Sequence, residues 1–275
     1  MVAINDEFRL AQTKPDLKVE ACRAMVNSAI AEGRVGLAFQ PVVRSGTRPI
    51  IAFHEGLVRI RDREGRTISA GEFVPAVENT SLVQALDRIA LQKTLDMLQA
   101  DPRQRLSVNM SPNSINDAEW MGILERNTHD HPTIADRLIV EITESGSMEN
   151  PDSTVQFMEF VHNIGCSFAI DDFGAGSTAF SHFRKFKFDM VKIDGQFITG
   201  IDHDRDNQVL VEAMVKIARH FDMYTVAEFI ETAAESAMVQ KLGIDAMQGY
   251  YYGRSEKMPI CLNTNGHLAP FAQTS

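Results

Sequence analysis

Short apolar segments alternate with longer amphipathic segments along most of this 275-residue chain. The apolar segments with the length of short buried strands are Leu106–Asn109, Leu138–Ile142, Phe168–Asp171, Met190–Ile193, Tyr224–Ala227 and Ala246–Gln248. Helical spacing of apolar residues is found at Ser81–Leu98, Ile115–Leu124, Pro151–Asn163, Ser177–Arg184, Asn207–His220 and Thr232–Leu242. This alternation predicts a mostly parallel sheet with helices packed against it.

The N-terminal part departs from this alternation. A helix is expected at Asp16–Glu32, followed by two strands at Val35–Val43 and Ile50–Ile60. The link between these strands, residues 44–49, is too short for a crossover helix, so the strands should be antiparallel neighbours. The full set of strands predicts an α/β fold, a modified TIM (β/α)8 barrel with one antiparallel strand. An open doubly wound sheet is the competing fold, but its G-x-G-x-x-G turn is absent.

Composition limits the classes of partner. The net charge of −10 and the pI of about 5.3 disfavour binding to nucleic-acid polymers and to anionic membranes. No apolar run approaches the ~18 residues of a membrane span, and no signal peptide is visible at the start. The three cysteines are far apart and predict reduced thiols, so we expect a cytoplasmic protein. Residues 16–260 should form one domain, with a loose lead-in at 1–15 and a polar tail at 261–275.

Polar residues stand in or just after most of the expected strands. They are Glu55, Asn109, Glu141, Asp171, Asp172, Lys192, Asp194, Glu228 and Gln248. In a barrel the carboxyl ends of the strands meet at one mouth, where active sites are built. Taken singly, each acid would be a solvated loop charge, but the set offers oxygen ligands of the kind that Mg²⁺ and Mn²⁺ prefer. The number of acids exceeds the need of one Mg²⁺ and favours a two-metal site for phosphoester hydrolysis.

Lys192 has two interpretations. A lysine on a barrel strand could form a Schiff base with a carbonyl substrate, but that role requires a lowered pKa. The neighbouring carboxylates would keep this lysine protonated. We therefore favour an ammonium group that orients the attacking water and stabilises charge.

Several segments carry a family resemblance. They are Phe39–Val43, Glu55–Arg59, Ser107–Ser111, Glu141–Ser145, Asp171–Gly176, Val191–Asp194, Ala227–Thr232 and Gln248–Tyr251. In this order and spacing the sequence resembles the EAL-domain cyclic di-GMP phosphodiesterases, from about Gly36 to Gly253. The resemblance implies a bacterial signalling hydrolase that converts cyclic di-GMP to linear pGpG with two Mg²⁺ or Mn²⁺ ions. Family members often form homodimers, so a homodimer is expected.

The resemblance also implies roles for individual residues. The implied metal ligands are Glu55, Asn109, Glu141, Asp171 and Asp172, with Asp171 shared by both ions. Glu228 matches the general base or water-linked ligand, and Lys192 the lysine that positions the water. The implied substrate contacts are Gln40, Arg59 and Gln248. The implied supporting acids are Glu144, which would tether the loop after Asp172, together with Asp194 and Glu231.

The sequence departs from the family pattern at a few positions. Gly56 replaces an alanine, Ser255 replaces a proline, and the loop at 177–180 lacks its usual aromatic and serine pair. Phe229 replaces a glycine beside Glu228 and could narrow the pocket. Three alternatives therefore stand beside catalysis: a receptor that binds cyclic di-GMP without cleaving it, a barrel that binds only proteins, and a lysine-dependent carbonyl enzyme.

Overall fold

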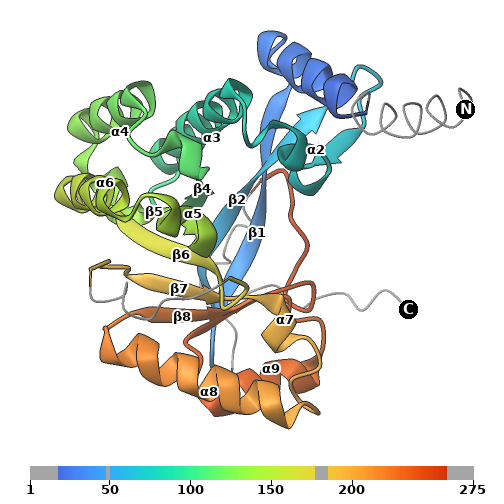
Figure 1. The fold of residues 1–275 in the computed structure, drawn as a ribbon, viewed down its shortest axis with the longest axis vertical. Helices are drawn as coiled ribbons and strands as arrows, with labels where there is room; N and C mark the ends of the chain where they lie inside the picture. Colours follow the sequence, from blue (N-terminus) through green and yellow to red (C-terminus); the bar gives the residue numbers. More distant parts are fainter. Residues whose placement is uncertain (1–17, 48–49, 177–184, 259–275) are drawn as a thin grey trace, which may run out of the picture.

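Eight strands close into a barrel in the computed structural model, which describes residues 18–47, 50–176 and 185–258 (Figure 1). Neighbouring strands follow the order β1-β9-β8-β7-β6-β5-β4-β2, and pairing of β1 with β2 closes the ring. The strands are β1 (Val35–Arg44), β2 (Ile51–Arg61), β4 (Leu106–Asn109), β5 (Leu138–Thr143), β6 (Ser167–Phe173), β7 (Met190–Ile193), β8 (Tyr224–Ala227) and β9 (Ala246–Gln248). The expected helix at Ser177–Arg184, the lead-in and the tail lie outside the described residues.

Strand β1 is antiparallel to both of its neighbours, β2 and β9. The other strands of the barrel pair in parallel. The short link after β1 forces the reversal, because a parallel pair needs a long crossover connection. The predicted modified TIM barrel with one antiparallel strand is therefore confirmed.

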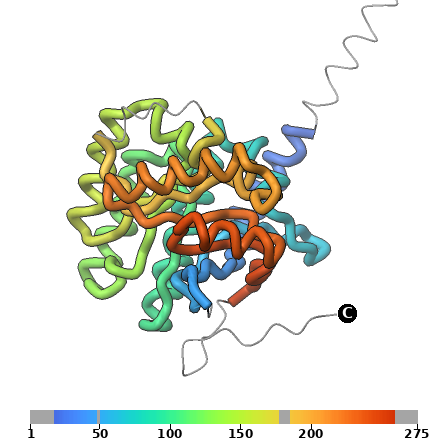
Figure 2. Tube along the Cα trace, turned by 90° about the horizontal axis from the view of Figure 1, so that it is seen from below, coloured from blue at the N-terminus to red at the C-terminus, as the bar shows by residue number. Residues whose placement is uncertain are grey.

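Helices cover the outside of the barrel. They are α3 (Ser81–Ala100), α4 (Ala118–Asp130), α5 (Glu144–Glu149), α6 (Pro151–Ile164), α7 (Gly195–Ile198), α8 (Arg205–His220) and α9 (Ala233–Leu242), with 3-10 turns at Pro112–Ser114 and Pro132–Arg137. Figure 2 shows α8 and α9 side by side on the outside of the barrel. The apolar faces of the helices pack against the strands, and Leu95, Trp120 and Phe157 are fully buried in this layer. Among the described residues, no helix has both the length and the apolar character needed to cross a membrane.

The structure corrects the start of one helix and adds two elements. Helix α4 begins at Ala118 rather than at Ile115, because the Asp117 carboxylate accepts hydrogen bonds from the backbone amides of Glu119 and Trp120. Strand β3 (Thr67–Ser69) and helix α2 (Ala70–Val77) were not expected from the sequence. Both are too short to show a clear apolar period.

The hairpin of β1 and β2 extends beyond the barrel. Strand β2 pairs with β4 only over His54–Gly56, whereas its pairing with β1 continues to Ile60. The projecting half is covered on one side by α2 and by the helix at 18–31. A second small core, which includes Val26, Ile60 and Phe73, holds this extension together.

The interior of the barrel has two layers. The lower layer is apolar and consists of Val42, Phe53, Ile139, Ala169, Met190, Val226 and Ala246. Side chains of a strand alternate between its two faces, so the next inward position along each strand lies two residues further. Those positions are mostly polar, and they form the layer at the mouth.

Candidate active site

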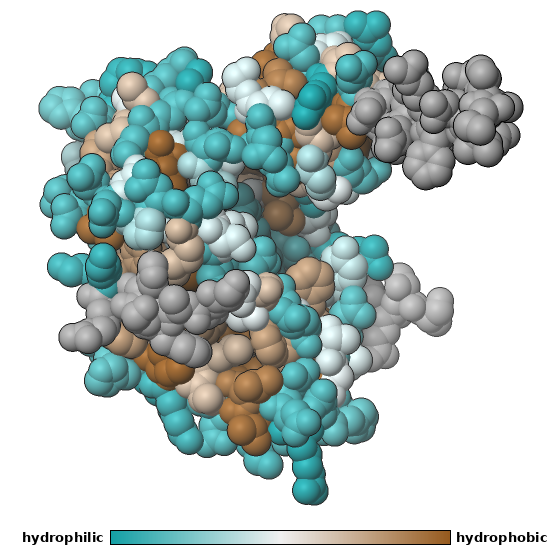
Figure 3. Space-filling model, in the orientation of Figure 1, coloured by the Kyte–Doolittle hydropathy of each residue, from teal (hydrophilic) through white to brown (hydrophobic). Residues whose placement is uncertain are grey.

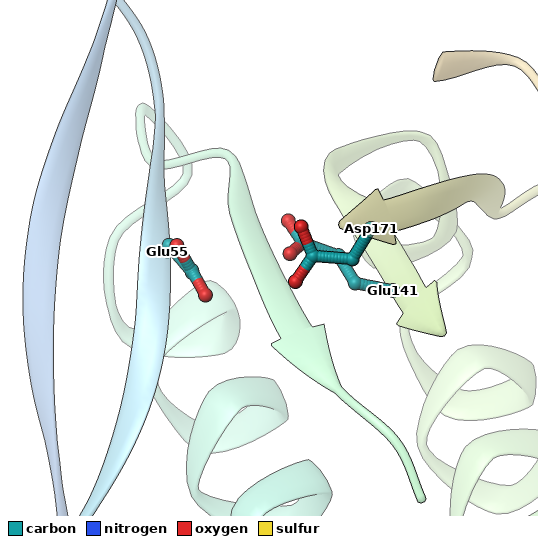
Figure 4. A group of neighbouring side chains, drawn as sticks. All are labelled: Glu55, Glu141 and Asp171. Atoms are coloured by element: carbon teal, nitrogen blue, oxygen red, sulfur yellow. The ribbon is translucent and has the colours of Figure 1, made fainter. Parts of the chain in front are cut away.

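The mouth of the barrel is lined by polar side chains from successive strands. Following the sheet, they are Gln40 on β1, Glu55 on β2, Asn109 on β4, Glu141 on β5, Asp171 on β6, Lys192 on β7, Glu228 just after β8, and Gln248 on β9. Figure 4 shows the carboxylates of Glu141 and Asp171 facing that of Glu55 across the interior. On the face shown in Figure 3, the surface is hollowed between the part that carries α2 and the part that carries α7 and α9. The structure thus brings most of the polar residues predicted from the strand ends into one group.

The ammonium group of Lys192 lies at the centre of this group and is fully buried. Its Nζ is 2.8 Å from Glu141 Oε2, 2.9 Å from Glu228 Oε1, 3.0 Å from Asp171 Oδ1 and 3.4 Å from Glu55 Oε2. Burial lowers the pKa of Lys192, but the four carboxylates outweigh it and raise that pKa well above its usual value. A Schiff-base lysine needs the opposite shift, so the geometry argues against carbonyl chemistry here.

Glu55 is the best compensated of the four acids. Asn109 Nδ2 donates to its Oε1 at 2.7 Å, and Gln248 Nε2 donates to its Oε2 at 2.6 Å. Burial alone would raise the pKa of Glu55, but the Lys192 charge and these two amides bring it below its usual value. Glu55 is therefore a carboxylate at neutral pH.

The other acids lack such compensation. Burial, followed by the charges of Glu55 and Asp171, raises the pKa of Glu141 to about 8. Burial, followed by the charge of Asp171, raises the pKa of Glu228 well above its usual value. Glu141 Oε1 has no hydrogen-bond partner, and Asp171 Oδ1 meets Lys192 only at ion-pair distance, without hydrogen-bond geometry. One ammonium cannot balance four buried carboxylates, so the group is short of positive charge.

Two sets of three carboxylates are close enough to hold a cation each. Glu55, Glu141 and Asp171 form the first set, and Asp171, Asp172 and Glu228 form the second. Within each set the ligand oxygens lie within 4.8 Å of one another. Asp171 belongs to both sets, which is the arrangement that the resemblance implies for a shared ligand. An all-oxygen donor set suits Mg²⁺ or Mn²⁺.

The loop after β6 is held by a neighbouring acid. Glu144 Oε2 accepts a hydrogen bond from the backbone amide of Gly174 at 2.8 Å, so this carboxylate lies where the sequence predicted a tether. Asp172 has a positive φ of 55°, and burial with the charges of Asp171 and Asp194 raises its pKa to about 6. Asp194 caps α7 by accepting from the amide of Gln196 at 2.9 Å.

Two of the three expected substrate contacts, Gln40 and Arg59, lie at the rim, whereas Gln248 is buried against Glu55. Gln40 is the register partner of Glu55 across the hairpin, and its Nε2 donates to the Gly253 carbonyl at 3.2 Å. The guanidinium of Arg59 donates to the Val58 carbonyl at 2.9 Å and to Ser255 Oγ at 3.0 Å. Ser255, which stands where the family often has proline, therefore helps to orient Arg59. These partners of Arg59 are uncharged and leave its charge available to an anion.

Two acids near the start of α9, Glu231 and Glu235, differ in burial. Glu231 is exposed, and the structure does not bring its carboxylate into the site. Glu235 is buried instead and accepts hydrogen bonds from the backbone amides of Gly200, Glu231 and Thr232, at 2.8, 3.0 and 2.9 Å. The sequence signal for Glu235 is the capping box formed with Thr232 three residues earlier.

Phe229 does not displace the acid beside it. Its backbone has a positive φ of 55°, a conformation that favours glycine, and its side chain is 59% exposed. The ring lies against Gly195, so closely that a Cβ atom on that glycine would come within 2.5 Å of it. Glu228 keeps its 2.9 Å contact with Lys192. Phe229 could therefore narrow the pocket at its rim, but it does not change the position of the Glu228 carboxylate.

The family model for the EAL domain matches residues 23–255. This chain belongs to the EAL domain family. It is 30% identical over 247 residues to "Cyclic di-GMP phosphodiesterase PdeF" of Escherichia coli, and that match covers 87% of this chain and 33% of the relative. It is 28% identical over 234 residues to "Bifunctional diguanylate cyclase/cyclic di-GMP phosphodiesterase MucR" of Pseudomonas aeruginosa, with coverages of 83% and 34%. The chain thus spans about a third of the length of these curated relatives.

This EAL domain is similar to a solved structure described as "PaMucR Phosphodiesterase, c-di-GMP complex", and the match covers nearly the whole of that structure. The TM-score is 0.78 at 26% sequence identity, and the match covers 86% of this chain and 97% of the other.

Proposed function

We propose that this EAL domain hydrolyses one phosphodiester bond of cyclic di-GMP, giving linear pGpG, and that the reaction requires two Mg²⁺ or Mn²⁺ ions. One observation carries the proposal: two sets of three carboxylates at the mouth share Asp171. Relatives named as cyclic di-GMP phosphodiesterases support the choice of substrate.

The residues of the site fit the proposed ions. A pair of dications would compensate the excess negative charge of the site. They would also bind the buried carboxylate oxygens that have no hydrogen-bond partner. Glu55, Asn109, Glu141 and Asp171 would hold one ion, and Asp171 with Asp172 the other. When bound, such ions neutralise the phosphodiester, acidify water and stabilise the leaving oxygen.

The protein's own groups have distinct tasks in this proposal. Glu228, whose Oε1 lies 2.9 Å from Lys192 Nζ, would accept the proton of the attacking water as a carboxylate. Lys192 stays protonated and fixes Glu228 and Glu141 through its contacts of 2.9 and 2.8 Å. Arg59 would bind a phosphate oxygen, and Gln40 would contact the substrate at the same rim.

Incubation of the purified domain with cyclic di-GMP and Mn²⁺ tests the proposal, with products separated by chromatography. We expect pGpG from the wild-type chain and none in excess chelator. Glu55→Gln should abolish the product, whereas Glu212→Gln on the exposed face of α8 should not change the rate. Unchanged hydrolysis by Glu55→Gln would contradict the proposed site.

A receptor that binds cyclic di-GMP without cleaving it is the second candidate, because Phe229 stands where the family usually has glycine. The receptor predicts binding of the dinucleotide by calorimetry with no pGpG formed. In that case Phe229→Gly should produce turnover. Cleavage by the wild-type chain would exclude the receptor.

We also propose that the domain forms a homodimer. Helix α8 presents two exposed apolar side chains, Val209 and Leu210, at 66% and 46% exposure. Light scattering after size exclusion tests this: a monomer at micromolar concentration would contradict it.

A further inference from the structure

A cationic cleft lies next to the mouth, on the part of the β1–β2 hairpin that extends beyond the barrel. Two adjoining cavities of about 430 and 550 Å³ share Ala38, Arg59, Thr67 and Lys257 in their linings. The first cavity is also lined by Gly36, Arg34 and Arg61. Arg59 and Ser255 meet across the second, so the cleft begins at the rim of the candidate active site.

The alternation of side chains explains why this face is open. Val35, Ile60 and Ile68 belong to the small core that packs under α2 and the helix at 18–31. The register pairs Gly36 with Arg59, and β3 places Thr67 beside Arg61 on the same face. The small residue Gly36 leaves room above β1, and the arginines of β2 form the wall.

The charge in this cleft is largely uncompensated. Within the described part of the chain, neither Arg61 nor Lys257 makes an ion pair, and the hydrogen bonds of Arg59 end on neutral groups. Arg34 is paired with Glu32 at 2.8 Å, and Glu256 lines the second cavity. Three cations therefore face the cleft against one acid in its lining.

This charge contrasts with the rest of the molecule. The chain has a net charge of −10, and the mouth concentrates carboxylates around Lys192. A dianionic substrate is repelled by such a surface over most approaches. The cationic cleft beside the anionic mouth makes the local electrostatic potential positive and so raises the rate at which an anionic substrate meets the protein.

Arg61 is too far from the carboxylates of the mouth to contact a phosphodiester bound there. Arg61 lies six residues beyond Glu55 along β2, which is roughly 20 Å at the rise of an antiparallel strand. A phosphodiester held by Glu55 and its neighbours is beyond the reach of the Arg61 side chain. Arg61 and Lys257 would therefore act on the incoming dinucleotide and not on the bound phosphate.

We propose that this cleft is the capture path for the anionic substrate. Arg61 and Lys257 hold the cyclic dinucleotide in an encounter complex beside Arg59, from which it enters the mouth. The inference rests on the proposed function, because it takes the dianionic cyclic dinucleotide as the ligand. The two residues that would direct the dinucleotide along this path, Arg61 and Lys257, lie outside the family's motifs.

Stopped-flow binding of a fluorescent cyclic di-GMP analogue, with Mn²⁺ present, tests the path directly. The Glu228→Gln chain serves as the reference so that bound dinucleotide is not consumed. In that background, Arg61→Gln with Lys257→Gln should lower the association rate constant roughly tenfold at low salt. The difference should shrink to less than about twofold at 0.5 M salt, because ions screen charges over a few ångströms there.

Matched variants separate the position of the charges from the net charge. Arg126→Gln with Lys241→Gln removes two exposed cations, one on α4 and one in the last turn of α9, and should leave the association rate unchanged. Arg61→Lys with Lys257→Arg keeps both charges and should retain the rate. Equal association rates for the cleft variant and its reference would overturn the proposal.

The same experiment distinguishes this proposal from the proposed activity. If the reference chain does not bind the analogue at all, the capture path is overturned. Metal-dependent hydrolysis of bis(p-nitrophenyl) phosphate by the chain with Glu228 intact then shows whether the domain has phosphodiesterase activity even though the capture path is absent. If the analogue binds at a rate that depends on the cleft cations but the intact chain cleaves nothing, the path holds and the proposed hydrolysis fails.

Discussion

At the scale of single residues, Lys192 determines how the site is held together without cations. Four carboxylates lie within 3.4 Å of its ammonium group, and both partners of every pair are largely out of water. Breaking a buried ion pair on one side leaves uncompensated charge, which costs far more than the pair contributes.

Lys192→Met should therefore lower the free energy of unfolding by about 3–5 kcal/mol in metal-free buffer. Urea denaturation followed by circular dichroism measures this change. Mn²⁺ should restore part of the loss, because it replaces the missing positive charge. Lys241→Met, at an exposed position on α9, is the control and should change the stability by less than about 0.5 kcal/mol. An equal loss in both variants would contradict the role of Lys192.

The acids around Lys192 also predict how stability depends on pH. The pKa of Glu141 rises from 4.5 to about 8 in the folded protein, so the folded state binds more protons than the unfolded chain between these values. Stability from this group therefore falls as pH rises through that range. Burial likewise raises the pKa of Asp87 to about 7, with the same sign. The pKa of buried His54 falls from 6.5 to about 4, with the opposite sign, but that contribution is complete above pH 6.5.

In excess chelator we therefore expect the melting temperature to fall between pH 6.5 and pH 8. Calorimetry at the two pH values measures it. Mn²⁺ should stabilise the protein more at pH 8, where fewer protons compete for the carboxylates. A metal-free melting temperature that is constant or rises over this interval would contradict the raised pKa of Glu141.

At the scale of elements, two neighbouring acids at the start of α9 provide a matched comparison. Glu235 connects the end of α7, through the Gly200 amide, with the first turn of α9. Glu235→Ala should cost about 1–3 kcal/mol, because three backbone amides lose their acceptor. Glu231→Ala removes an exposed carboxylate and should cost less than about 0.5 kcal/mol. Chemical denaturation of both variants checks the pair, and equal costs would contradict the structural role of Glu235.

The elements also show what the sequence can and cannot predict. The strands and long helices follow from apolar periodicity, and the polar residues of the mouth follow from their place at strand ends. Strand β3 and helix α2 were missed because their stability comes from packing in the small core with Phe73, which local pattern does not reveal. Glu231 was named as a supporting acid and Glu235 was not considered, because motif position does not tell which carboxylate turns inward. The contacts of Lys192 depend on barrel closure between β2 and β7, far apart in sequence.

At the scale of the whole molecule, the fold concentrates negative charge at one end of the barrel and places the cationic cleft beside it. The apolar lower layer fills the interior of the barrel beneath the acids. In the proposed mechanism the EAL barrel separates three tasks: the strands hold the carboxylates, Lys192 fixes their spacing, and the projecting hairpin would face the approaching anion.

We propose that cations held by two carboxylate sets, joined at Asp171, drive hydrolysis of cyclic di-GMP. The most direct measurement is the rate of pGpG formation as Mn²⁺ is titrated, for the wild-type chain and for Asp171→Asn. We predict a rate that depends on more than one Mn²⁺ in the wild type and falls by a factor of about 10³ or more in Asp171→Asn. The same rate with Mn²⁺ and with excess chelator, or an unchanged rate in Asp171→Asn, would contradict this account.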